Sequence, residues 1–252
     1  MNSEEELILL FQNIKNRGWI ETNRHGDQCL GNTFENLIGK EEDNKAEADF
    51  KGIELKSHRL ITKSLVSLFS KSPSYPKAAN TYLREEYGVT DSNEFGKKML
   101  YTTISGNKYN SHRGGHNFKF DVDRNDKKLW LLVKDSNTDV ILEGPTAGKC
   151  IYWDFSVIEN ALEKKLKKIA ILYGNEKDEN GKHYVQFTKM KLLEGLTLEK
   201  MLSALELGDL YLDIRIGVYE SGKNIGKTHD HGSGFRMKLE KLLSYATVKD
   251  VE

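Results

Sequence analysis

The apolar runs of this sequence are short, and their length limits what the chain can fold into more than any other feature. The longest runs cover five residues each: Leu7–Phe11, Leu129–Val133 and Ile169–Tyr173. A membrane-spanning helix needs about 20 such residues. Of the 252 residues, 38% are hydrophobic and 30% are charged, a balance typical of globular proteins. We therefore expect a soluble protein with no membrane segment, formed by one large domain or two small ones.

The cysteines and the first residues predict the compartment. Cys29 and Cys150 are too few for a disulfide framework and too far apart for a Cys-x-x-Cys site. Glu4, Glu5 and Glu6 place negative charge where a secretory signal carries positive charge. We therefore expect an intracellular protein without a structural zinc site.

Helical and strand-like patterns alternate along the chain. Helices are predicted over residues 4–15, 32–38, 77–87, 156–167 and 198–207, the second of them capped by Asn32 or Thr33. Strands are predicted over residues 48–57, 65–69, 99–104, 118–122, 129–133, 169–173, 184–187 and 212–218. No repeat or Pro/Ser-rich linker divides these segments. The expected fold is mixed α/β, with two lobes and no clear boundary between them.

The net charge of zero conceals blocks of opposite sign. Residues 1–50 hold 5 Lys or Arg and 11 Asp or Glu, whereas residues 51–84 hold 7 Lys or Arg and a single acid, Glu54. Residues 215–241 are again basic, with 6 Lys or Arg and 3 acids. A phosphate-binding groove beside a metal-binding carboxylate site requires such blocks. The alternative is that they are the solvated faces of a highly charged chain.

One predicted strand carries a possible hydrolytic site. Side chains alternate along a strand, so Glu54 and Lys56 share one face while Ile53 and Leu55 point into a core. Asp49, just upstream, can turn its carboxylate towards the polar face. Two carboxylates and the carbonyl of Leu55 form an oxygen-rich site for Mg²⁺, and Lys56 can orient water for phosphodiester hydrolysis. The alternative is an exposed edge strand with a Glu/Lys pair.

Two further segments carry polar residues in patterns that suit the same chemistry. Glu35 lies in the first turn of the second predicted helix, where a carboxylate is also favoured by the helix dipole alone. A glycine-rich segment near the C-terminus holds Arg215, His229, Asp230, His231 and Arg236. Arginine and histidine can donate to guanine edges and aspartate can accept from a cytosine amino group. A metal site built on the two histidines, or a solvated loop, are the alternatives.

Taken together, these motifs resemble the MvaI/BcnI group of restriction endonucleases, nearest to its MvaI branch, and that group is similar to the mismatch-repair nicking enzyme MutH. The motifs follow one another in order over nearly the whole chain: 31–35, 49–56, 63–64, 71–73, 215–217 and 227–236. The resemblance implies a PD-(D/E)xK nuclease core in which Asp49, Glu54 and Lys56 are catalytic and Glu35 is a supporting acid. Mg²⁺ is the implied cofactor, with Asp49, Glu54 and Leu55 as its ligands. Ala48 stands where the motif has proline.

The resemblance also implies how the chain binds double-stranded DNA. Two lobes would close around a DNA cleft, residues 1–150 mainly catalytic and residues 151–252 mainly for recognition, with some interleaving. The residues implied to recognise bases are Arg215, His229, Asp230, His231 and Arg236. Those implied to contact phosphates are Lys63, Lys71 and Arg84.

The implied activity is that of a type II restriction endonuclease. It would cut a CCNGG-type site, with A or T at the centre, and leave 5′-phosphate and 3′-hydroxyl ends. The protein would act as a monomer in the cytoplasm of a prokaryotic cell, beside a companion DNA methyltransferase. The alternatives are a MutH-like strand-nicking repair endonuclease and a non-catalytic, sequence-specific DNA-binding protein.

Overall fold

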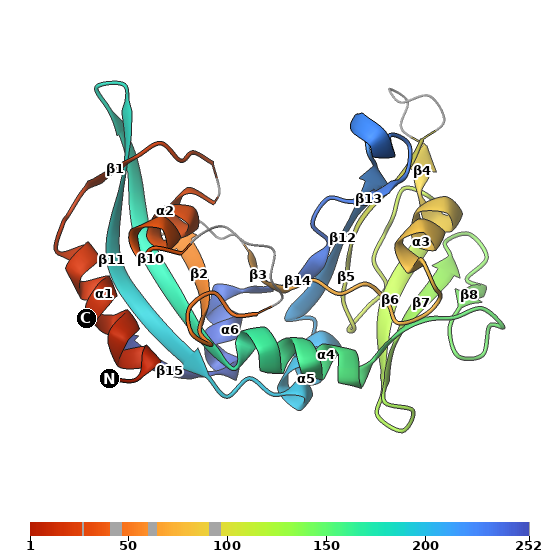
Figure 1. Cartoon of the computed structure of the whole chain (residues 1–252). Coiled ribbons are helices and arrows are strands. Elements are labelled where there is room, and N and C mark those ends of the chain that lie inside the picture. The colour runs from red at the N-terminus through yellow and green to blue at the C-terminus, as the bar shows by residue number, and fades with distance from the viewer. Residues whose placement is uncertain (27, 41–46, 60–64, 91–96, 252) are drawn as a thin grey trace. The chain divides into compact units, whose positions relative to one another are not determined.

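Helices and strands alternate through the chain, as Figure 1 shows, and this confirms the predicted mixed α/β fold. The coordinates are those of a computed structural model that describes residues 1–26, 28–40, 47–59, 65–90 and 97–251. The chain forms two compact units that are interleaved in the sequence. The first comprises Met1–Val66, Ala161–Leu196 and Leu239–Glu252, and the second Ser67–Asn160 and Thr197–Lys238.

The first unit is a mainly antiparallel sheet with helices packed against it. Its helices are α1 (Ser3–Lys15), α2 (Cys29–Leu37) and α6 (Leu239–Tyr245), and its strands are β1 (Ile20–Thr22), β2 (Glu54–Arg59), β10 (Lys168–Glu179), β11 (Lys182–Glu194) and β15 (Thr247–Val251). The strand order is β1-β11-β10-β2, and β15 pairs with the other end of β11. β2 runs parallel to β10, with Glu54 opposite Ile169.

The core of the first unit fixes α2 against the sheet. α1 begins with a capping box formed by Asn2 and Glu5 and buries one apolar stripe. Phe11 of that stripe lies 6.4 Å from the ring of Phe34 on α2, and Phe34 packs edge-on against Phe187 of β11 at 5.3 Å. These rings are fully buried. Because Phe34 is packed into the core, Glu35, the next residue of α2, is held at a defined place beside the sheet.

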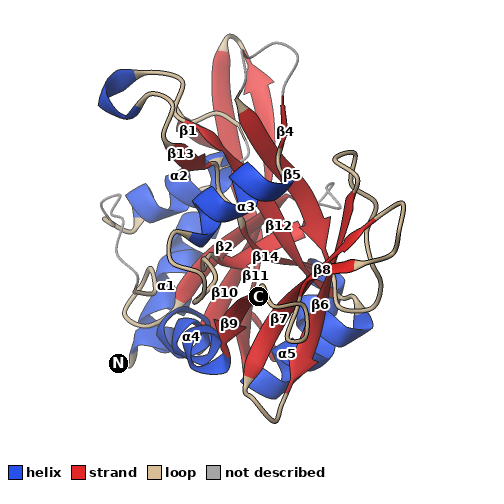
Figure 2. Ribbon diagram, turned by 90° about the vertical axis from the view of Figure 1, so that its right-hand side faces the viewer, coloured by secondary structure: helices blue, strands red, loops and turns tan. Residues whose placement is uncertain are grey.

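The second unit contains two sheets. Its helices are α3 (Ala79–Tyr87) and α5 (Leu198–Leu207), and its strands are β3 (Leu65–Phe69), β4 (Val89–Thr90), β5 (Lys98–Ile104), β6 (His116–Asp123), β7 (Lys128–Asp135), β8 (Ile141–Glu143), β9 (Ile151–Asp154), β12 (Leu210–Val218), β13 (Thr228–Asp230) and β14 (Gly234–Lys238). One sheet has the order β3-β14-β12-β5-β4, with β13 also on β12, and the other has the order β6-β7-β8, with β9 also on β7. Figure 2 shows α5 beside β6.

An aromatic cluster joins the two sheets of the second unit. Phe235 of β14 stacks on Phe69 of β3 at 4.8 Å and lies 6.3 Å from Phe120 of β6. Trp153 of β9 packs edge-on against Phe120 at 5.5 Å. All four side chains are buried. The cluster therefore fixes β14, and β12 beside it, against the second sheet. These two strands carry several of the predicted DNA-contacting residues.

Two predicted element starts near the candidate site are wrong, each for a local reason. The strand predicted from residue 48 begins only at Glu54, because Lys51 and Gly52 take φ angles of 45° and 89° and form a tight turn. Phe50 and Ile53 exchange backbone hydrogen bonds across that turn. The second helix begins at Cys29, ahead of the predicted caps, because its first residues are drawn into the core.

Other expectations concern the helix after β9, the membrane and the cysteines. The helix predicted over residues 156–167 is α4 (Phe155–Ala161), which continues as a π-helical turn (Leu162–Leu166). Within the described ranges, no helix is long and apolar enough to cross a membrane. Cys29 and Cys150 are both free thiols. The assignment of catalysis to residues 1–150 and of recognition to residues 151–252 stays a prediction.

Candidate functional site

The turn before β2 brings Asp49 back beside the strand. Asp49 Oδ2 accepts a hydrogen bond from the Leu55 amide at 3.0 Å. Only one of the two oxygens is used in this way, and Asp49 is about one-fifth exposed. The sequence predicted that Asp49 turns its carboxylate towards the polar face of the strand, and the turn at residues 51–52 is the means by which it does so.

Glu54 is a buried carboxylate with one unsatisfied oxygen. Its side chain is only 3% exposed, and its Oε1 accepts a hydrogen bond from Lys56 Nζ at 2.6 Å. Its Oε2 is buried and has no hydrogen-bond partner among the described residues. A buried carboxylate oxygen without a donor is energetically costly unless a cation binds it. β2 does end the described strand order of its sheet and Glu54 does pair with Lys56, but the burial of Glu54 contradicts the alternative of an exposed strand.

Lys40 is part of the site, although it was not predicted as a site residue. Its ammonium group pairs with Asp49 Oδ1 and lies 3.6 Å from Glu35 Oε2. The residue follows Gly39, whose φ of 76° is typical of the glycine that ends a helix. Recognising that stop signal would have placed Lys40 at the exit of α2, close to the predicted acid on the same helix.

The environment of Glu35 shifts its protonation. Burial raises the pKa of the Glu35 carboxyl, and the positive charge of Lys40 partly offsets this effect. The neighbouring charges of Asp49 and Glu54 raise the pKa further. A raised carboxyl pKa that arises from burial and from like charges is common where several acids converge on one site.

These five side chains form one group, which we call the carboxylate cluster: Glu35, Lys40, Asp49, Glu54 and Lys56. Three carboxylates share the space with two ammonium groups, so one negative charge is in excess. All the acidic donors are oxygens, the ligand type that Mg²⁺ prefers. The buried Oε2 of Glu54, which has no hydrogen-bond partner among the described residues, also suits a bound cation. The residues of the cluster therefore fit Mg²⁺. That the Leu55 carbonyl is a ligand stays a prediction.

A second polar group lies on β12 and β14 of the second unit, and we call it the arginine cluster: Asp213, Arg215 and Arg236. Asp213 Oδ2 accepts from Arg215 Nε at 2.8 Å and lies 3.5 Å from Arg236 Nη1. Burial lowers the pKa of the Arg236 guanidinium, Asp213 opposes this, and Arg215 lowers it further. Asp213 was not predicted as a site residue. Its spacing of two from Arg215 on a strand was the available signal.

The arginine cluster borders an open cavity. The cavity has a volume of about 490 Å³, and its lining includes Tyr101, Thr103, Arg113, Asp213 and Arg215. Arg215 is 45% exposed, whereas Arg236 is 16% exposed. The Nε of Arg236 is buried without a hydrogen-bond partner in the part of the chain that the structure describes. The cluster thus keeps both an exposed guanidinium and an unused N–H donor.

The two predicted histidines form a ring cluster with Tyr219 next to β12, which we call the histidine stack, although only His229 is stacked on Tyr219 and the His231 ring is tilted by 57° to that of His229. His229 stacks on Tyr219 with ring centroids 4.0 Å apart, and the His231 ring lies 4.3 Å from that of His229. Gly217 makes room for them, because a Cβ there would lie 2.9 Å from His231 Nε2. In the described ranges, the two histidines do not gather with a third His, Cys, Asp or Glu ligand. This arrangement favours ring stacking over the alternative of a metal site.

Asp230 shapes the loop between β13 and β14. Its Oδ1 accepts from the amides of Gly232 and Ser233 at 3.0 and 2.6 Å, and its Oδ2 accepts from Asn80 Nδ2 of α3 at 3.1 Å. One oxygen therefore holds the loop in shape, and the other ties Asp230 to α3. The predicted base contact of Asp230 stays a prediction, and the structure adds Asn80 as the residue that orients this carboxylate.

The three predicted phosphate contacts differ in their surroundings. Lys63 lies outside the described residues. Lys71 is exposed and follows β3. The Arg84 side chain is only 11% exposed, and it donates to the hydroxyl of Thr228 at 3.2 Å and to the Lys98 carbonyl at 3.4 Å. Arg84 thus holds α3 against β13, and its phosphate contact stays a prediction.

Comparison with known proteins gives concordant results. The sequence profile of the MvaI/BcnI restriction endonuclease family matches residues 8–244. In the solved complex of restriction endonuclease MvaI with its cognate DNA substrate, the MvaI chain is 41% identical to this one, and the TM-score is 0.87. The match covers 100% of this chain and 99% of the MvaI chain. MvaI in the absence of DNA is also 41% identical, with a TM-score of 0.67 and coverage of 100% and 98%. No curated protein matches the chain.

The profile match and the structural likeness extend over nearly all of the sequence, as the predicted resemblance did. They agree with the observed α/β architecture. The identity of 41% over all of this sequence and 99% of the MvaI chain is far above the level at which only a fold is shared. This chain is therefore a member of the MvaI/BcnI restriction endonuclease family, and a site-specific deoxyribonuclease.

Proposed function

We propose that the protein is a Mg²⁺-dependent type II restriction endonuclease that binds double-stranded DNA and cuts both strands at a CCNGG-type site. The central base pair would be A·T or T·A, and the products would carry 5′-phosphate and 3′-hydroxyl ends. The observation that carries this proposal is the carboxylate cluster, in which three acids and two lysines meet at the start of β2. Its relative MvaI has been solved with a cognate DNA substrate.

Asp49, Glu54 and the carbonyl of Leu55 would hold Mg²⁺. The unpartnered Oε2 of Glu54 and the excess negative charge of the cluster support this assignment. When bound there, Mg²⁺ would offset the charge of the scissile phosphate and acidify a water molecule. Divalent metals suit the chemistry of the family, and the oxygen-only donor set favours Mg²⁺ among them.

The lysines of the cluster have separate tasks in this proposal. Lys56 Nζ, fixed at 2.6 Å from Glu54, would position the attacking water and stabilise negative charge that develops on the phosphate. Lys40 would neutralise Asp49 and Glu35 while no divalent cation is present. Glu35 would support Asp49 from the end of a helix that the core holds in place.

Sequence readout would depend on the arginine cluster and the histidine stack. Arg215 and Arg236 carry guanidinium donors that match the O6 and N7 acceptors of guanine. His229 and His231 extend the row of donors, and Asp230 would accept from cytosine or hold the loop in shape. Lys63, Lys71 and Arg84 would contact phosphates, which fix the register but carry no base information.

The cellular setting follows from this activity. A restriction endonuclease endangers the DNA of its own cell, so a companion methyltransferase with the same target would have to protect it. We also propose that the protein acts as a monomer and in the cytoplasm, where incoming DNA is met. Sedimentation of the protein alone and with a cognate duplex checks the monomer.

Digestion of a supercoiled plasmid tests the proposal. The plasmid carries CCAGG, CCTGG, CCCGG and CCGGG sites, and digestion is run with Mg²⁺ and with EDTA. We expect discrete fragments in Mg²⁺ only, and sequencing of their ends names the site. Asp49→Asn protein, purified in parallel, reports any contaminating nuclease. Nicked circles would replace the proposal with a MutH-like nicking enzyme, and intact plasmid with folded protein would indicate a non-catalytic DNA-binding protein.

A further inference from the structure

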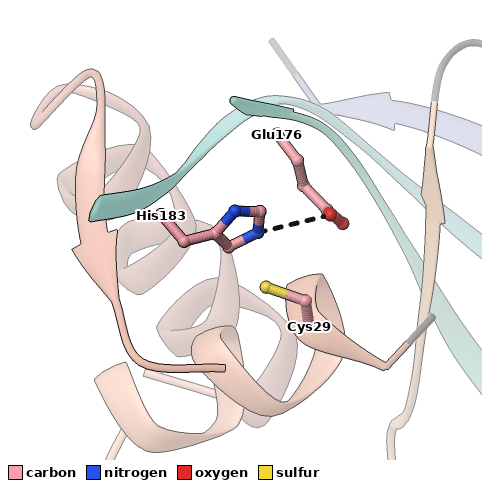
Figure 3. A group of neighbouring side chains, drawn as sticks. All are labelled: Cys29, Glu176 and His183. Carbon is pink, nitrogen blue, oxygen red and sulfur yellow. Dashed lines mark ion pairs between the residues drawn. The ribbon is translucent and has the colours of Figure 1, made fainter. Parts of the chain in front are cut away.

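The first unit contains a second group of metal-ligating side chains, separate from the carboxylate cluster. The side chains of Cys29, Glu176 and His183 point toward one another (Figure 3). Their ligand atoms all lie within 4.8 Å of one another. Cys29 opens α2, Glu176 lies on β10 and His183 lies on β11. The proposed nuclease activity gives none of these three residues a role.

The β10–β11 hairpin puts two of these residues on one face. Asn180 and Gly181, with φ angles of 52° and 75°, form the tight turn that joins the strands. The resulting register sets His183 opposite Asp178, two residues from Glu176. Glu176 and Asp178 therefore share a face, and His183 lies over both of them. His183 Nε2 is 3.5 Å from Glu176 Oε2.

His183 is oriented as a metal ligand is. Its Nδ1 lies 2.7 Å from the Asp178 carboxylate, which can accept an Nδ1–H bond, and in the neutral imidazole the lone pair is then on Nε2. The side chain is only 10% exposed. Nε2 is buried and accepts no hydrogen bond from the described residues. A carboxylate on one ring nitrogen and an unused lone pair on the other are the features of a histidine that binds a metal.

Cys29 and Glu176 supply the other two donors. Cys29 is 1% exposed, and its thiol donates to the Arg24 carbonyl at 3.2 Å. Burial raises the pKa of the Cys29 thiol, and the charge of Glu176 raises it further. Glu176 accepts hydrogen bonds from Arg59 Nε at 2.7 Å and from Arg59 Nη2 at 3.0 Å, which fix the carboxylate in place.

We propose that Cys29, Glu176 and His183 form a binding site for Zn²⁺, with Asp178 and Arg59 as the groups that orient two of the ligands. A thiolate, an imidazole and a carboxylate together suit Zn²⁺ and not Mg²⁺. As Zn²⁺ enters, the Cys29 thiol releases its proton to solvent and a Zn–S bond forms. Tetrahedral ligand atoms lie about 3.3–3.8 Å apart, given Zn–ligand bonds of about 2.0–2.3 Å, so the side chains need to close by only about 1 Å.

The expectation of no structural zinc site rested on the lack of a Cys-x-x-Cys motif. The proposed ligands lie at positions 29, 176 and 183, which become neighbours only when β10 and β11 pair and α2 packs beside them. The proposed site lies on the same sheet as β2, but its donors are not those of the carboxylate cluster. Its metal binding can therefore be measured without DNA and without Mg²⁺.

Cobalt substitution tests the proposal. The purified full chain is stripped with EDTA, dialysed and titrated with Co²⁺ and then with Zn²⁺ as competitor. We expect one equivalent of Co²⁺ to give a thiolate-to-cobalt charge-transfer band and the intense visible bands of a tetrahedral site, both abolished by Zn²⁺. Absence of these bands in folded wild-type protein would overturn the proposal.

Matched variants locate the site. Cys150→Ser, at the other free cysteine, keeps the bands, whereas Cys29→Ser loses the charge-transfer band. Asp178→Asn, at an 81% exposed residue that a fold defect does not threaten, lowers the Zn²⁺ affinity by about 10- to 100-fold. Retained bands in Cys29→Ser, loss of the bands in Cys150→Ser, or an unchanged affinity in Asp178→Asn would each contradict the proposed ligands. Circular dichroism of every variant confirms that it is folded.

Discussion

The carboxylate cluster and the arginine cluster are built from the same kinds of ionic group in opposite proportions. In the first unit, three carboxylates meet two ammonium groups, and the Glu54 side chain is 3% exposed. In the second, two guanidinium groups share the single carboxylate of Asp213, and Arg215 is 45% exposed. The first cluster has negative charge in excess inside the protein, and the second has positive charge in excess at an open cavity.

This difference separates two tasks of a DNA-cutting enzyme. An excess of buried negative charge with an unpartnered oxygen attracts a small cation. An excess of exposed positive charge attracts phosphates and guanine edges. The means of positioning differ as well: a backbone turn and a helix stop place Asp49 and Lys40, whereas one shared carboxylate orients Arg215 and Arg236. Substitutions in the two clusters should therefore affect different measurements.

The largest effect is expected from Asp49→Asn in the carboxylate cluster. Cleavage of a cognate duplex should fall by about 10³-fold or more, the scale on which loss of a charge-stabilising group lowers kcat. Binding of the same duplex, measured by gel shift in Ca²⁺, should be unchanged. Glu163→Gln is the control, because Glu163 belongs to another Glu-x-Lys sequence but is exposed. An equal loss of binding and cleavage would remove Asp49 from the catalytic set.

A smaller effect is expected from Arg236→Ala in the arginine cluster. Loss of one bidentate base contact should reduce discrimination between CCAGG and a duplex with one altered G·C pair by about 1–3 kcal/mol. The cleavage rate at saturating DNA should change little. Lys238→Ala, at an exposed position of the same strand, is the control. If the variant keeps full discrimination, Arg236 does not read the sequence.

A third substitution, Lys40→Met, tests the charge balance of the carboxylate cluster. Removal of an ammonium group from Asp49 and Glu35 should let the site saturate at an about tenfold lower Mg²⁺ concentration, since a positive charge a few Å away is worth about 1.4 kcal/mol. The measurement is the Mg²⁺ dependence of cleavage. Lys249→Met, which breaks the exposed 2.8 Å pair with Glu4, should leave the dependence unchanged. A higher Mg²⁺ requirement in Lys40→Met would show that Lys40 helps the metal to bind.

The smallest effect is expected from Glu35→Gln, measured as stability in EDTA. The folded-state pKa of Glu35 is raised, mainly by burial, so just above the ordinary range of a glutamate the folded state holds more protons than the unfolded state. Wild-type stability therefore falls as the pH rises through that window. Denaturant unfolding at several pH values should show that the variant is more stable at neutral pH and that its advantage disappears in acid. An advantage that grows on acidification would contradict the assignment.

Much of the fold could be read from local patterns in the sequence. Leu65–Phe69 and Leu198–Leu207 were predicted with the observed bounds, because each is apolar with the period of its element and is bounded by turn or cap residues. The predictions over residues 169–173 and 184–187 were too short, since both strands continue through polar residues to the Asn180–Gly181 turn. That dipeptide is a strong hairpin signal and marks where the pairing ends.

The candidate site could be predicted only in part, for a physical reason. Asp49, Glu54 and Lys56 are close in sequence, so strand periodicity and one turn suffice to bring them together. Lys40 and Asp213 were missed, although a helix stop and a spacing of two on a strand pointed to them. Glu176 and His183 meet across the Asn180–Gly181 hairpin, but Cys29 joins them only when α2 packs beside that hairpin, and no local pattern encodes that packing.

The most direct test of the division of tasks compares Asp49→Asn and Arg236→Ala side by side. Equilibrium binding in Ca²⁺ and single-turnover cleavage in Mg²⁺ are measured on a CCAGG duplex and on one with a single altered pair. We expect opposite results for the two variants. Asp49→Asn keeps the wild-type ratio of affinities for the CCAGG duplex and the altered duplex but does not cleave. Arg236→Ala cleaves, but its affinities for the two duplexes become similar. If both variants lose cleavage and discrimination together, the two clusters do not have separate tasks and the account is wrong.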